Sequence, residues 1–357
     1  MEKKKRELLF AGFNQDNQCF SVGTNEGFII YNTDPFKLNF ERGKYNLIIL
    51  KIYIVLEGEI AMVIMLYRTN ILALVGSDNN MNHKRSKLII WDDHQKKPLS
   101  ELKFNQNIMN VKLRKDKIIV VCRDKIYVFN LSTFKNMDII ETGDNSHGIV
   151  GVSYDPEQTL LAYPDKKKGQ VRIKSYEKSS VFYINAHENN IANITLSYDG
   201  SLLATASEQG TLIRIFNTEN GNLLQEIRRG KDKADIKYIC FEPSYKFIAA
   251  SSNKGTIHIW SLANTLKSLN KTNEDDSSNK IDNKTSGLKW LPNFLGGEFF
   301  NSEWSFAQVR ITDPRSICCF GADNTIIIVS TEGKYYKAQI DMEKGGDCKI
   351  IQEEQLI

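Results

Sequence analysis

The sequence lacks an apolar run long enough to cross a membrane. Its most apolar region, residues 47–67, is interrupted by Lys51, Glu57 and Glu59. A membrane-spanning helix needs about 20 apolar residues with few or no charges. We therefore expect a cytoplasmic protein whose contact with membranes is peripheral.

Metal-ligand and catalytic motifs are also missing. The six cysteines are scattered, mostly within strand-like runs, which favours reduced core thiols in a cytosolic protein over a metal site. The sequence contains no phosphate-binding P-loop, no dinucleotide-binding glycine motif, no nucleophile elbow and no His-Glu-x-x-His. We therefore expect a protein that is not an enzyme and has neither a metal nor a cofactor.

Neither sign of charge is in large excess. There are 47 Lys and Arg residues against 43 Asp and Glu residues, which gives a net charge of +4. No stripe of basic and aromatic residues is visible, and this argues against a nucleic-acid partner. An anionic ligand would therefore have to be attracted by a local patch of charge.

One unit recurs along the chain: a short apolar strand, a polar or glycine turn, and a second apolar strand. β-Branched and aromatic residues fill the strands, and the spacing is close to the 40–45 residues or so of WD-type repeats. Two units carry Trp91-Asp92 and Trp260-Ser261 where a WD repeat has its Trp-Asp pair. The units span residues 19–32, 71–93, 117–131, 160–177, 202–221, 247–262 and 325–341.

A unit of this kind cannot bury its faces alone, so a ring of blades is needed to complete the core. The sequence predicts an all-β fold: a single seven-bladed WD-type β-propeller formed by residues 1–357, with one long loop in the sixth blade. A six-bladed ring with a separate terminal hairpin is the alternative.

The long loop, residues 263–302, is the one extended segment outside the repeats. Residues 270–287 are polar and low in apolar residues, so we expect them to be disordered. Residues 288–300 concentrate aromatic and aliphatic side chains, which suit a membrane interface. Packing of this part against the blade, especially at Phe299 and Phe300, is the alternative. The expected membrane-inserting residues are Leu288, Trp290, Leu291, Phe294 and Leu295.

An arginine pair lies between two copies of the repeat unit, in the tetrapeptide Ile227-Arg228-Arg229-Gly230. Adjacent side chains of a strand point to opposite faces of its sheet, so each arginine could serve a different neighbouring repeat. Guanidinium forks, hydroxyl groups and the backbone of a glycine turn together suit a phosphate group. The pattern indicates a pair of anion sites.

The chain resembles the PROPPINs, the phosphoinositide-binding β-propellers that include the WIPI proteins of animals and autophagy-related proteins of yeast. The resemblance covers nearly the whole chain, and Ile227 replaces the Phe or Leu that usually precedes the Arg-Arg-Gly of the family. The matching stretches include Asn185-Ala-His-Glu188, Ala204-Thr-Ala-Ser-Glu-Gln-Gly-Thr-Leu-Ile-Arg214, Ile227-Arg-Arg-Gly230 and Lys254-Gly-Thr-Ile-His-Ile259.

The resemblance implies two phosphoinositide pockets, one on each side of the arginine pair. The lipids would be phosphatidylinositol 3-phosphate and phosphatidylinositol 3,5-bisphosphate. The first pocket would use His187, Thr205, Ser207, Gly210, Thr211, Arg214 and Arg228; the second would use Arg229, Ser252, Thr256 and His258, with Lys254 as a helper.

The resemblance also implies a role and a location. The protein would be a monomer in solution, recruited peripherally to autophagic, endosomal, vacuolar or plastid membranes. There it would act as a scaffold for autophagy or vesicle-traffic proteins, in autophagosome formation, endolysosomal traffic or, in parasites with a plastid, apicoplast biogenesis.

Purely structural interpretations remain open for the same residues. Gly210 is explained equally well as a hairpin-turn glycine with positive φ. His187 and His258 could complete hydrogen-bond networks within blades, as histidines of WD-type repeats do. The alternative function is therefore a lipid-independent WD-repeat scaffold for protein interactions.

Overall fold

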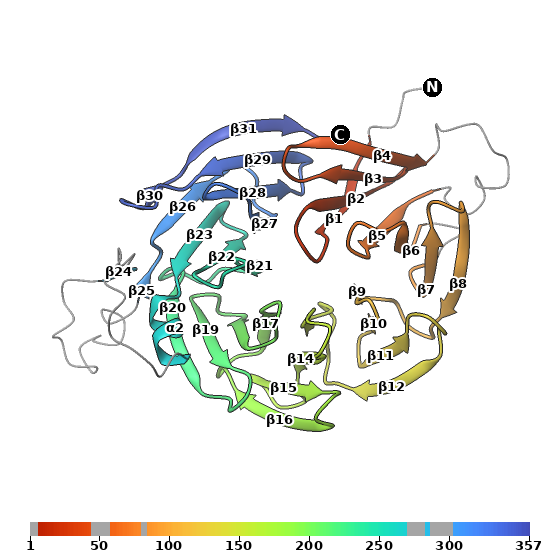
Figure 1. Ribbon diagram of the computed structural model, residues 1–357, viewed down its shortest axis with the longest axis horizontal. Coiled ribbons are helices and arrows are strands. Elements are labelled where there is room, and N and C mark those ends of the chain that lie inside the picture. The colour runs from red at the N-terminus through yellow and green to blue at the C-terminus, as the bar shows by residue number, and fades with distance from the viewer. Residues whose placement is uncertain (1–5, 44–57, 80–83, 270–282, 286–302) are drawn as a thin grey trace. The chain divides into compact units, whose positions relative to one another are not determined.

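The computed structural model describes residues 6–43, 58–79, 84–269, 283–285 and 303–357. These residues form seven sheets, each built around four antiparallel strands, so the expected seven-bladed β-propeller is confirmed and the six-bladed alternative is wrong (Figure 1). Each repeat unit found in the sequence corresponds to the second and third strands of one blade. The chain divides into two compact units, residues 1–149 with 329–335 and 354–357, and residues 150–328 with 336–353, which are described separately.

The first unit holds three blades, each made from consecutive strands. They comprise β1 (Leu8–Phe13), β2 (Cys19–Thr24), β3 (Gly27–Asn32) and β4 (Lys37–Gly43); β5 (Ile60–Met65), β6 (Ile71–Gly76), β7 (Lys87–Asp92) and β8 (Lys97–Lys103); and β9 (Asn110–Leu113), β10 (Lys117–Val121), β11 (Lys125–Asn130) and β12 (Asn136–Glu141).

The second unit holds blades four, five and six and most of blade seven. Blade four is β13 (Gly151–Val152), β14 (Leu160–Pro164), β15 (Gln170–Ser175) and β16 (Ser180–Asn185), and blade five is β17 (Ile191–Leu196), β18 (Leu202–Ser207), β19 (Leu212–Asn217) and β20 (Leu223–Arg228). Blade six is β21 (Ile236–Phe241), β22 (Phe247–Ser252), β23 (Thr256–Ser261) and β26 (Ala307–Arg310), and blade seven is β27 (Ser316–Phe320), β28 (Thr325–Ser330), β29 (Lys334–Gln339) and β31 (Lys349–Gln355).

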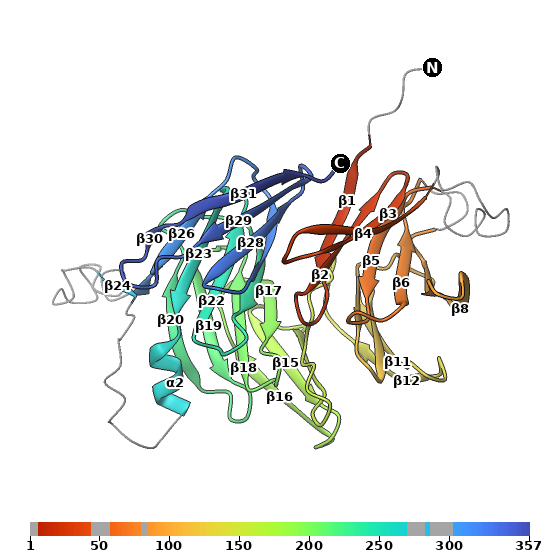
Figure 2. The same cartoon turned by 45° about the horizontal axis from the view of Figure 1, so that its top comes forward.

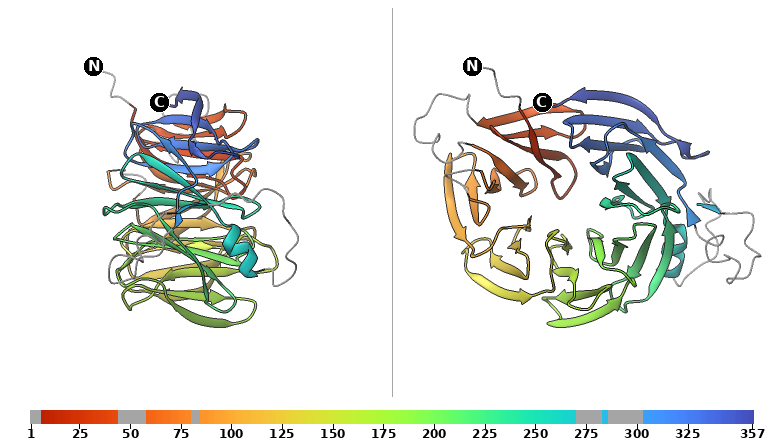
Figure 3. Two further views of the ribbon diagram at one scale, coloured as in Figure 1. Left: turned by 90° about the vertical axis from the view of Figure 1, so that its left-hand side faces the viewer. Right: turned by 180° about the vertical axis from the view of Figure 1, so that it is seen from behind.

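The long connection lies within blade six, between β23 and β26, as expected from the sequence. It contains short elements. Helix α2 (Ala263–Leu269) opens it and lies beside β20 (Figures 2 and 3). The sequence did not predict this helix. Strands β24 (Lys284–Thr285) and β25 (Glu303–Trp304) add to the outer edge of blade five, and β30 (Gly346–Asp347) adds to blade six. Residues 284–285, expected to be disordered, are therefore paired with a strand.

The second strand of each blade explains the apolar and small-residue runs in the sequence. Every residue of β18 and of β22 is buried, because both faces of a blade are covered by packed side chains. The third strands β19 and β23 alternate between partly and fully buried residues. Within the second unit, Ile213 and Ile227 of blade five join Ile239 and Ile248 of blade six in one apolar cluster. Adjacent blades thus share a core.

Aromatic packing links the chain's last blade to its first inside the first unit. The ring of Tyr335 lies 4.5 Å from that of Phe36 and 6.2 Å from that of Phe20, between centroids. The Tyr335 hydroxyl donates a hydrogen bond to the carbonyl of Thr33 at 3.0 Å, and the Tyr31 hydroxyl donates one to the carbonyl of Leu356 at 2.8 Å. Within the first unit, these ring contacts and the two side-chain hydrogen bonds connect residues 329–335 and 354–357 to blade one.

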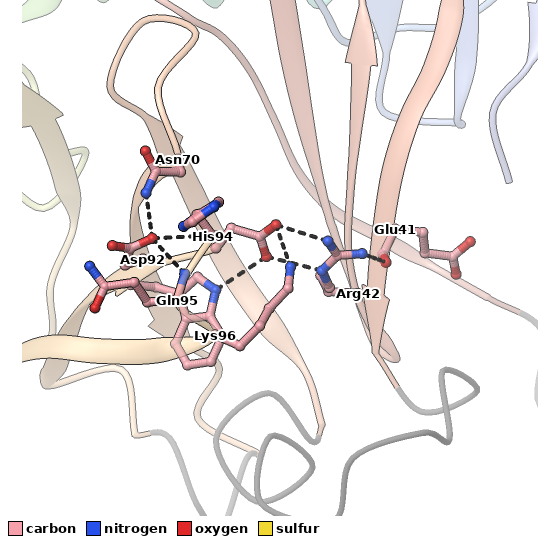
Figure 4. A network of polar contacts seen from close by, with 9 residues as sticks. Glu41, Arg42, Asn70, Asp92, His94, Gln95 and Lys96 are labelled. Carbon is pink, nitrogen blue, oxygen red and sulfur yellow. Dashed lines mark hydrogen bonds and ion pairs between the residues drawn. The ribbon is translucent and has the colours of Figure 1, made fainter.

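A polar network around Asp93 joins β4 of blade one to the turn after β7. Figure 4 labels its members Arg42 and Lys96. Arg42 binds both carboxylate oxygens, at 3.0 and 2.8 Å, and Lys96 binds one of them at 2.7 Å. Trp91, fully buried, adds a hydrogen bond from Nε1 at 3.3 Å. Burial acts to raise the pKa of Asp93, but the hydrogen bonds and charges of Arg42 and Lys96 outweigh it and hold the pKa below its usual value.

We expect Asp93→Ala to lower the free energy of unfolding by about 1–3 kcal/mol, because it leaves Arg42 and Lys96 without their shared acceptor. Since the pKa of Asp93 is lowered in the folded state, this contribution is fully present above the ordinary aspartate pKa of about 3.9 and is lost as the pH falls below it. Urea unfolding between pH 3 or so and pH 7 measures both effects.

The matched control is Asp78→Ala in the same blade. Asp78 pairs with Arg85 at 3.8 Å and its side chain is 62% exposed, so its loss should change stability by less than about 1 kcal/mol. Equal effects of the two substitutions on the free energy of unfolding would show that the Asp93 network does not stabilise the contact between blades one and two.

Candidate functional site

The strand pairing of blade five indicates that the side chains of Arg228 and Arg229 lie on opposite sides of the blade. Thr205 of β18 pairs with Arg214 of β19, which pairs with Glu226 of β20. Directly paired residues and every second residue share a face of a sheet, so Arg228 lies on the face of these three. Ile227 lies on the opposite face, where it is fully buried.

Arg229 follows the strand and lies on the side toward blade six. Its Nε donates to the carbonyl of Gly210 at 3.0 Å and its Nη2 donates to the carbonyl of Asp232. Its side chain is close enough to His258 of β23 for the charge of Arg229 to lower the pKa of that ring. The expected alternation of Arg228 and Arg229 is therefore present.

A first polar cluster lies where blade four meets blade five. The Nε2 of His187 is 3.0 Å from the hydroxyl of Thr205. Arg214 donates from Nη1 to the carbonyl of Ala186 at 2.7 Å and from Nε to Glu226 at 2.7 Å. The structure thus brings together His187, Thr205 and Arg214, while Glu226 is a member that the sequence analysis missed. Pairing of Glu226 with Arg214 across the strands is a register effect that no local motif signals.

The His187 ring is neutral at neutral pH. Burial, followed by the positive charge of Arg214, lowers its pKa to about 4. A histidine ring donates more strongly when it is protonated next to an anion. In the free protein the His187 ring is therefore unprotonated at neutral pH, and a bound anion would have to raise the pKa of the ring for it to carry a proton.

A second polar cluster lies between blades five and six. The Nδ1 of His258 is 3.1 Å from the hydroxyl of Ser305, and its ring is stacked on Trp260 with 5.6 Å between centroids. Burial, followed by the charges of Arg229 and Arg310, lowers the pKa of His258 to about 4. Three basic side chains therefore face one small region, which suits an anion.

Ser305 and Arg310 are members of this second cluster that the sequence analysis missed. Arg310 is exposed and lies opposite Thr256 in the pairing of β23 with β26. These residues come after the long loop, about 50 positions from His258 in the sequence. Only the return of the chain to blade six as β26 brings them close.

The remaining predicted site residues lie in or beside the two turns. Gly210 has a φ of +62°, and a Cβ there would stand 1.7 Å from the carbonyl oxygen of Ala234. The close approach of turn and linker therefore explains this glycine without a ligand. Ser207 and Ser252 are buried, Thr211 is half-buried and accepts a hydrogen bond from the amide of Arg229 at 2.9 Å, and Lys254 is exposed.

Both ends of the long connection are anchored beside β20. Glu303 accepts hydrogen bonds from the side-chain amides of Gln225, Asn283 and Asn264 at 2.6, 2.6 and 2.8 Å. Gln225 in turn accepts bonds from the amide and hydroxyl of Thr265 in α2. Trp304 pairs with Arg228 in the register of β20 and β25. The base of the connection is thus fixed next to the arginine pair.

The expected membrane-inserting residues Leu288, Trp290, Leu291, Phe294 and Leu295 lie outside the described residues. Among the residues that the structure does describe, no group of His, Cys, Asp and Glu is arranged to hold a metal ion. No helix in the described part of the chain has the length and apolar character to span a membrane.

The architecture defines a seven-bladed β-propeller with a basic polar cluster on each side of its fifth blade. The chain belongs to the PROPPIN family, whose model matches residues 8–357. It is 34% identical over 347 residues to autophagy-related protein 18e of Arabidopsis thaliana, covering 96% of this chain and 86% of that protein.

Solved structures of the same fold are similar over nearly the whole chain. The structure of Kluyveromyces lactis Hsv2 matches with a TM-score of 0.78 and 23% identity, covering 99% of this chain and 100% of that one. A structure described as a complex of KlAtg21 with the coiled-coil of AgAtg16 matches with a TM-score of 0.74 and 26% identity, covering 98% and 100%.

We expect the pKa of His187 and of His258 to lie near 4 in the free protein, measured from ring nitrogen shifts by NMR. Because each folded pKa lies below the ordinary value of about 6.5, the folded state is stabilised above pH 6.5 or so and loses that contribution as the pH falls toward 4. Arg310→Ser should raise the pKa of His258 and leave that of His187 unchanged. A shift of both rings, or of neither, would contradict two separate clusters.

We expect Glu303→Ala to lower the free energy of unfolding by about 1–3 kcal/mol, because it removes the carboxylate that accepts hydrogen bonds from three side-chain amides. Chemical denaturation measures the change. Glu219→Ala, an exposed carboxylate in the turn after β19, is the control and should change stability by less than about 0.5 kcal/mol. If both variants behave alike, Glu303 does not anchor the connection.

Proposed function

We propose that this protein is a peripheral membrane effector that binds phosphatidylinositol 3-phosphate and phosphatidylinositol 3,5-bisphosphate. One headgroup would bind at the cluster of His187, Arg214 and Arg228, and the other at the cluster of Arg229, His258 and Arg310. The observation that carries the proposal is the division of Arg228 and Arg229 between two basic clusters on opposite sides of one blade.

The chemistry of the two clusters supports this ligand class. Guanidinium groups can bind phosphate oxygens in pairs, and Ser and Thr hydroxyls and turn amides can donate to the remaining oxygens. A bound phosphate would also favour protonation of His187 and His258, adding a donor to each site. Two moderate sites on one protein give strong overall binding, because the second contact becomes intramolecular.

The described ends of the long connection, α2 and β25, lie beside β20, where Trp304 pairs with Arg228. We propose that residues 263–302 face the membrane and that the aromatic stretch inserts into it. This would add apolar binding to headgroup recognition.

The family relatives support a setting in autophagy. The protein would be recruited from the cytoplasm to membranes rich in these lipids and would scaffold autophagy or vesicle-traffic proteins there. Since a similar propeller is described in complex with a coiled-coil, a coiled-coil protein is the partner type we propose.

A lipid-independent protein scaffold is the second candidate, and one observation favours it. Arg214 already pairs with Glu226, and Arg229 already binds the carbonyls of Gly210 and Asp232. Both arginines therefore have structural roles without any ligand. If this second candidate is right, replacing these arginines would destabilise the propeller, and the protein would show no headgroup-selective binding.

Vesicle flotation with single and double variants distinguishes the two candidates. Phosphatidylcholine vesicles would carry phosphatidylinositol, its 3-phosphate, its 4-phosphate or its 3,5-bisphosphate. We expect selective flotation with the 3-phosphorylated lipids. Arg228→Thr and Arg229→Thr should each weaken it about tenfold or more, and the double variant should abolish it.

Two controls protect this test from a folding artefact. Arg229→Lys keeps the charge but loses the fork that binds the two carbonyls, and Arg123→Thr removes an arginine whose side chain is 72% exposed in blade three. Circular dichroism and thermal melting establish that each variant is folded. Headgroup-selective flotation of a folded double variant would overturn the proposal.

A further inference from the structure

The turn between β14 and β15 carries three consecutive exposed lysines, Lys166, Lys167 and Lys168, before Gly169. It is the only run of three lysines among the residues that the structure describes. The hairpin itself does not require them. The same turn reads Asn25-Glu26-Gly27 in blade one, Glu208-Gln209-Gly210 in blade five and Thr331-Glu332-Gly333 in blade seven.

The lysine turn is fixed at the edge of the first polar cluster. The carbonyl of Gly169 accepts hydrogen bonds from the amides of Ala186 and His187, both at 3.0 Å. Gly169 has a φ of +70°, and a Cβ there would lie 1.7 Å from the carbonyl oxygen of His187. The turn therefore cannot move away from His187 without breaking this packing.

Neighbouring blades repeat the same arrangement within the second unit. Gly210 packs against Ala234, and Gly255 packs against Ile311, each from a turn onto the linker that follows its blade. The turns before β15, β19 and β23 therefore lie at corresponding strand ends, beside the two clusters. A membrane that reaches both clusters would also lie near the lysine turn.

Three exposed lysines follow one another at this edge of blade four. Asp165, the acidic residue next to them, forms an ion pair with Arg172 at 2.5 Å. On the following linker, exposed Lys231 and Lys233 are separated by exposed Asp232, whereas no acidic residue interrupts Lys166, Lys167 and Lys168.

We propose that Lys166, Lys167 and Lys168 form a third membrane contact, which binds anionic lipids such as phosphatidylserine that carry no inositol phosphate. This inference rests on the proposed function and adds a second lipid requirement to it. Lysine ammonium groups are compact, hydrated charges on flexible stems, so they suit a diffuse anionic surface better than one oriented headgroup. Their attraction is long-ranged at low salt and screened at high salt.

The test compares the wild-type protein with Lys166→Ser/Lys167→Ser/Lys168→Ser. Flotation would use phosphatidylcholine vesicles with the 3-phosphate lipid alone, with the 3-phosphate lipid plus phosphatidylserine, and with phosphatidylserine alone, each at low and high salt. We expect phosphatidylserine to strengthen wild-type binding about fivefold or more at low salt, and the triple variant to lose this gain. Binding to vesicles with the 3-phosphate lipid alone should be unchanged.

The matched control is Lys178→Ser/Lys246→Ser/Lys344→Ser. These three lysines are equally exposed but lie on turns at the opposite strand ends, after β15, β21 and β29. The control changes the net charge by the same amount. An equal loss of the phosphatidylserine effect in the control would overturn a local contact, because it would show a response to overall charge.

The vesicles with phosphatidylserine alone separate this inference from the proposed function. Weak, salt-sensitive binding that needs Lys166, Lys167 and Lys168 supports the lysine contact even if 3-phosphate recognition fails. Wild-type binding that ignores phosphatidylserine in every mixture overturns it, whether or not the 3-phosphate lipid is recognised. That result would assign the lysine turn to a protein partner instead.

Discussion

The structure depends on one constraint: a four-stranded blade cannot bury both of its faces alone, so each blade needs its neighbours. The apolar cluster shared by Ile213 and Ile227 of blade five with Ile239 and Ile248 of blade six shows how this is met. The glycine turns follow from the same packing, since Gly169 and Gly210 allow each turn to approach the next linker closely. The polar side chains of the two clusters lie beside these turns.

The two polar clusters thus lie where neighbouring blades pack together, and both contain basic residues. Arg228 ends β20 and Arg229 follows it, so alternation places their side chains on opposite sides of blade five. Each cluster joins a histidine to arginines under partial burial, which lowers the pKa of His187 and His258 to about 4. Positive charge in a partly buried position favours the binding of an anion, and the proposed membrane contact of Lys166, Lys167 and Lys168 would lie on the adjoining surface.

Much of the fold could be predicted because it repeats. Every unit recognised in the sequence became the second and third strands of a blade, since those strands are the most buried and hence the most apolar. Helix α2 was missed because its sequence is short and carries no strong helix signal; Thr265 is held there by Gln225 of another blade. Of the candidate site residues, His187, Thr205 and Arg214 meet in one cluster and Arg229 and His258 in another, whereas Glu226, Ser305 and Arg310 were not foreseen.

The sequence by itself determined the number of blades, the position of the long connection in blade six and the place of the arginine pair between two repeats. These features follow from local periodicity, which each segment carries independently of the others. Only the tertiary structure decided which charges face each other. Glu226 meets Arg214 through strand register, Arg310 meets His258 through the return of the chain as β26, and Glu303 meets Gln225 through the added strand β25. Such contacts join residues distant in the chain, so no local pattern specifies them.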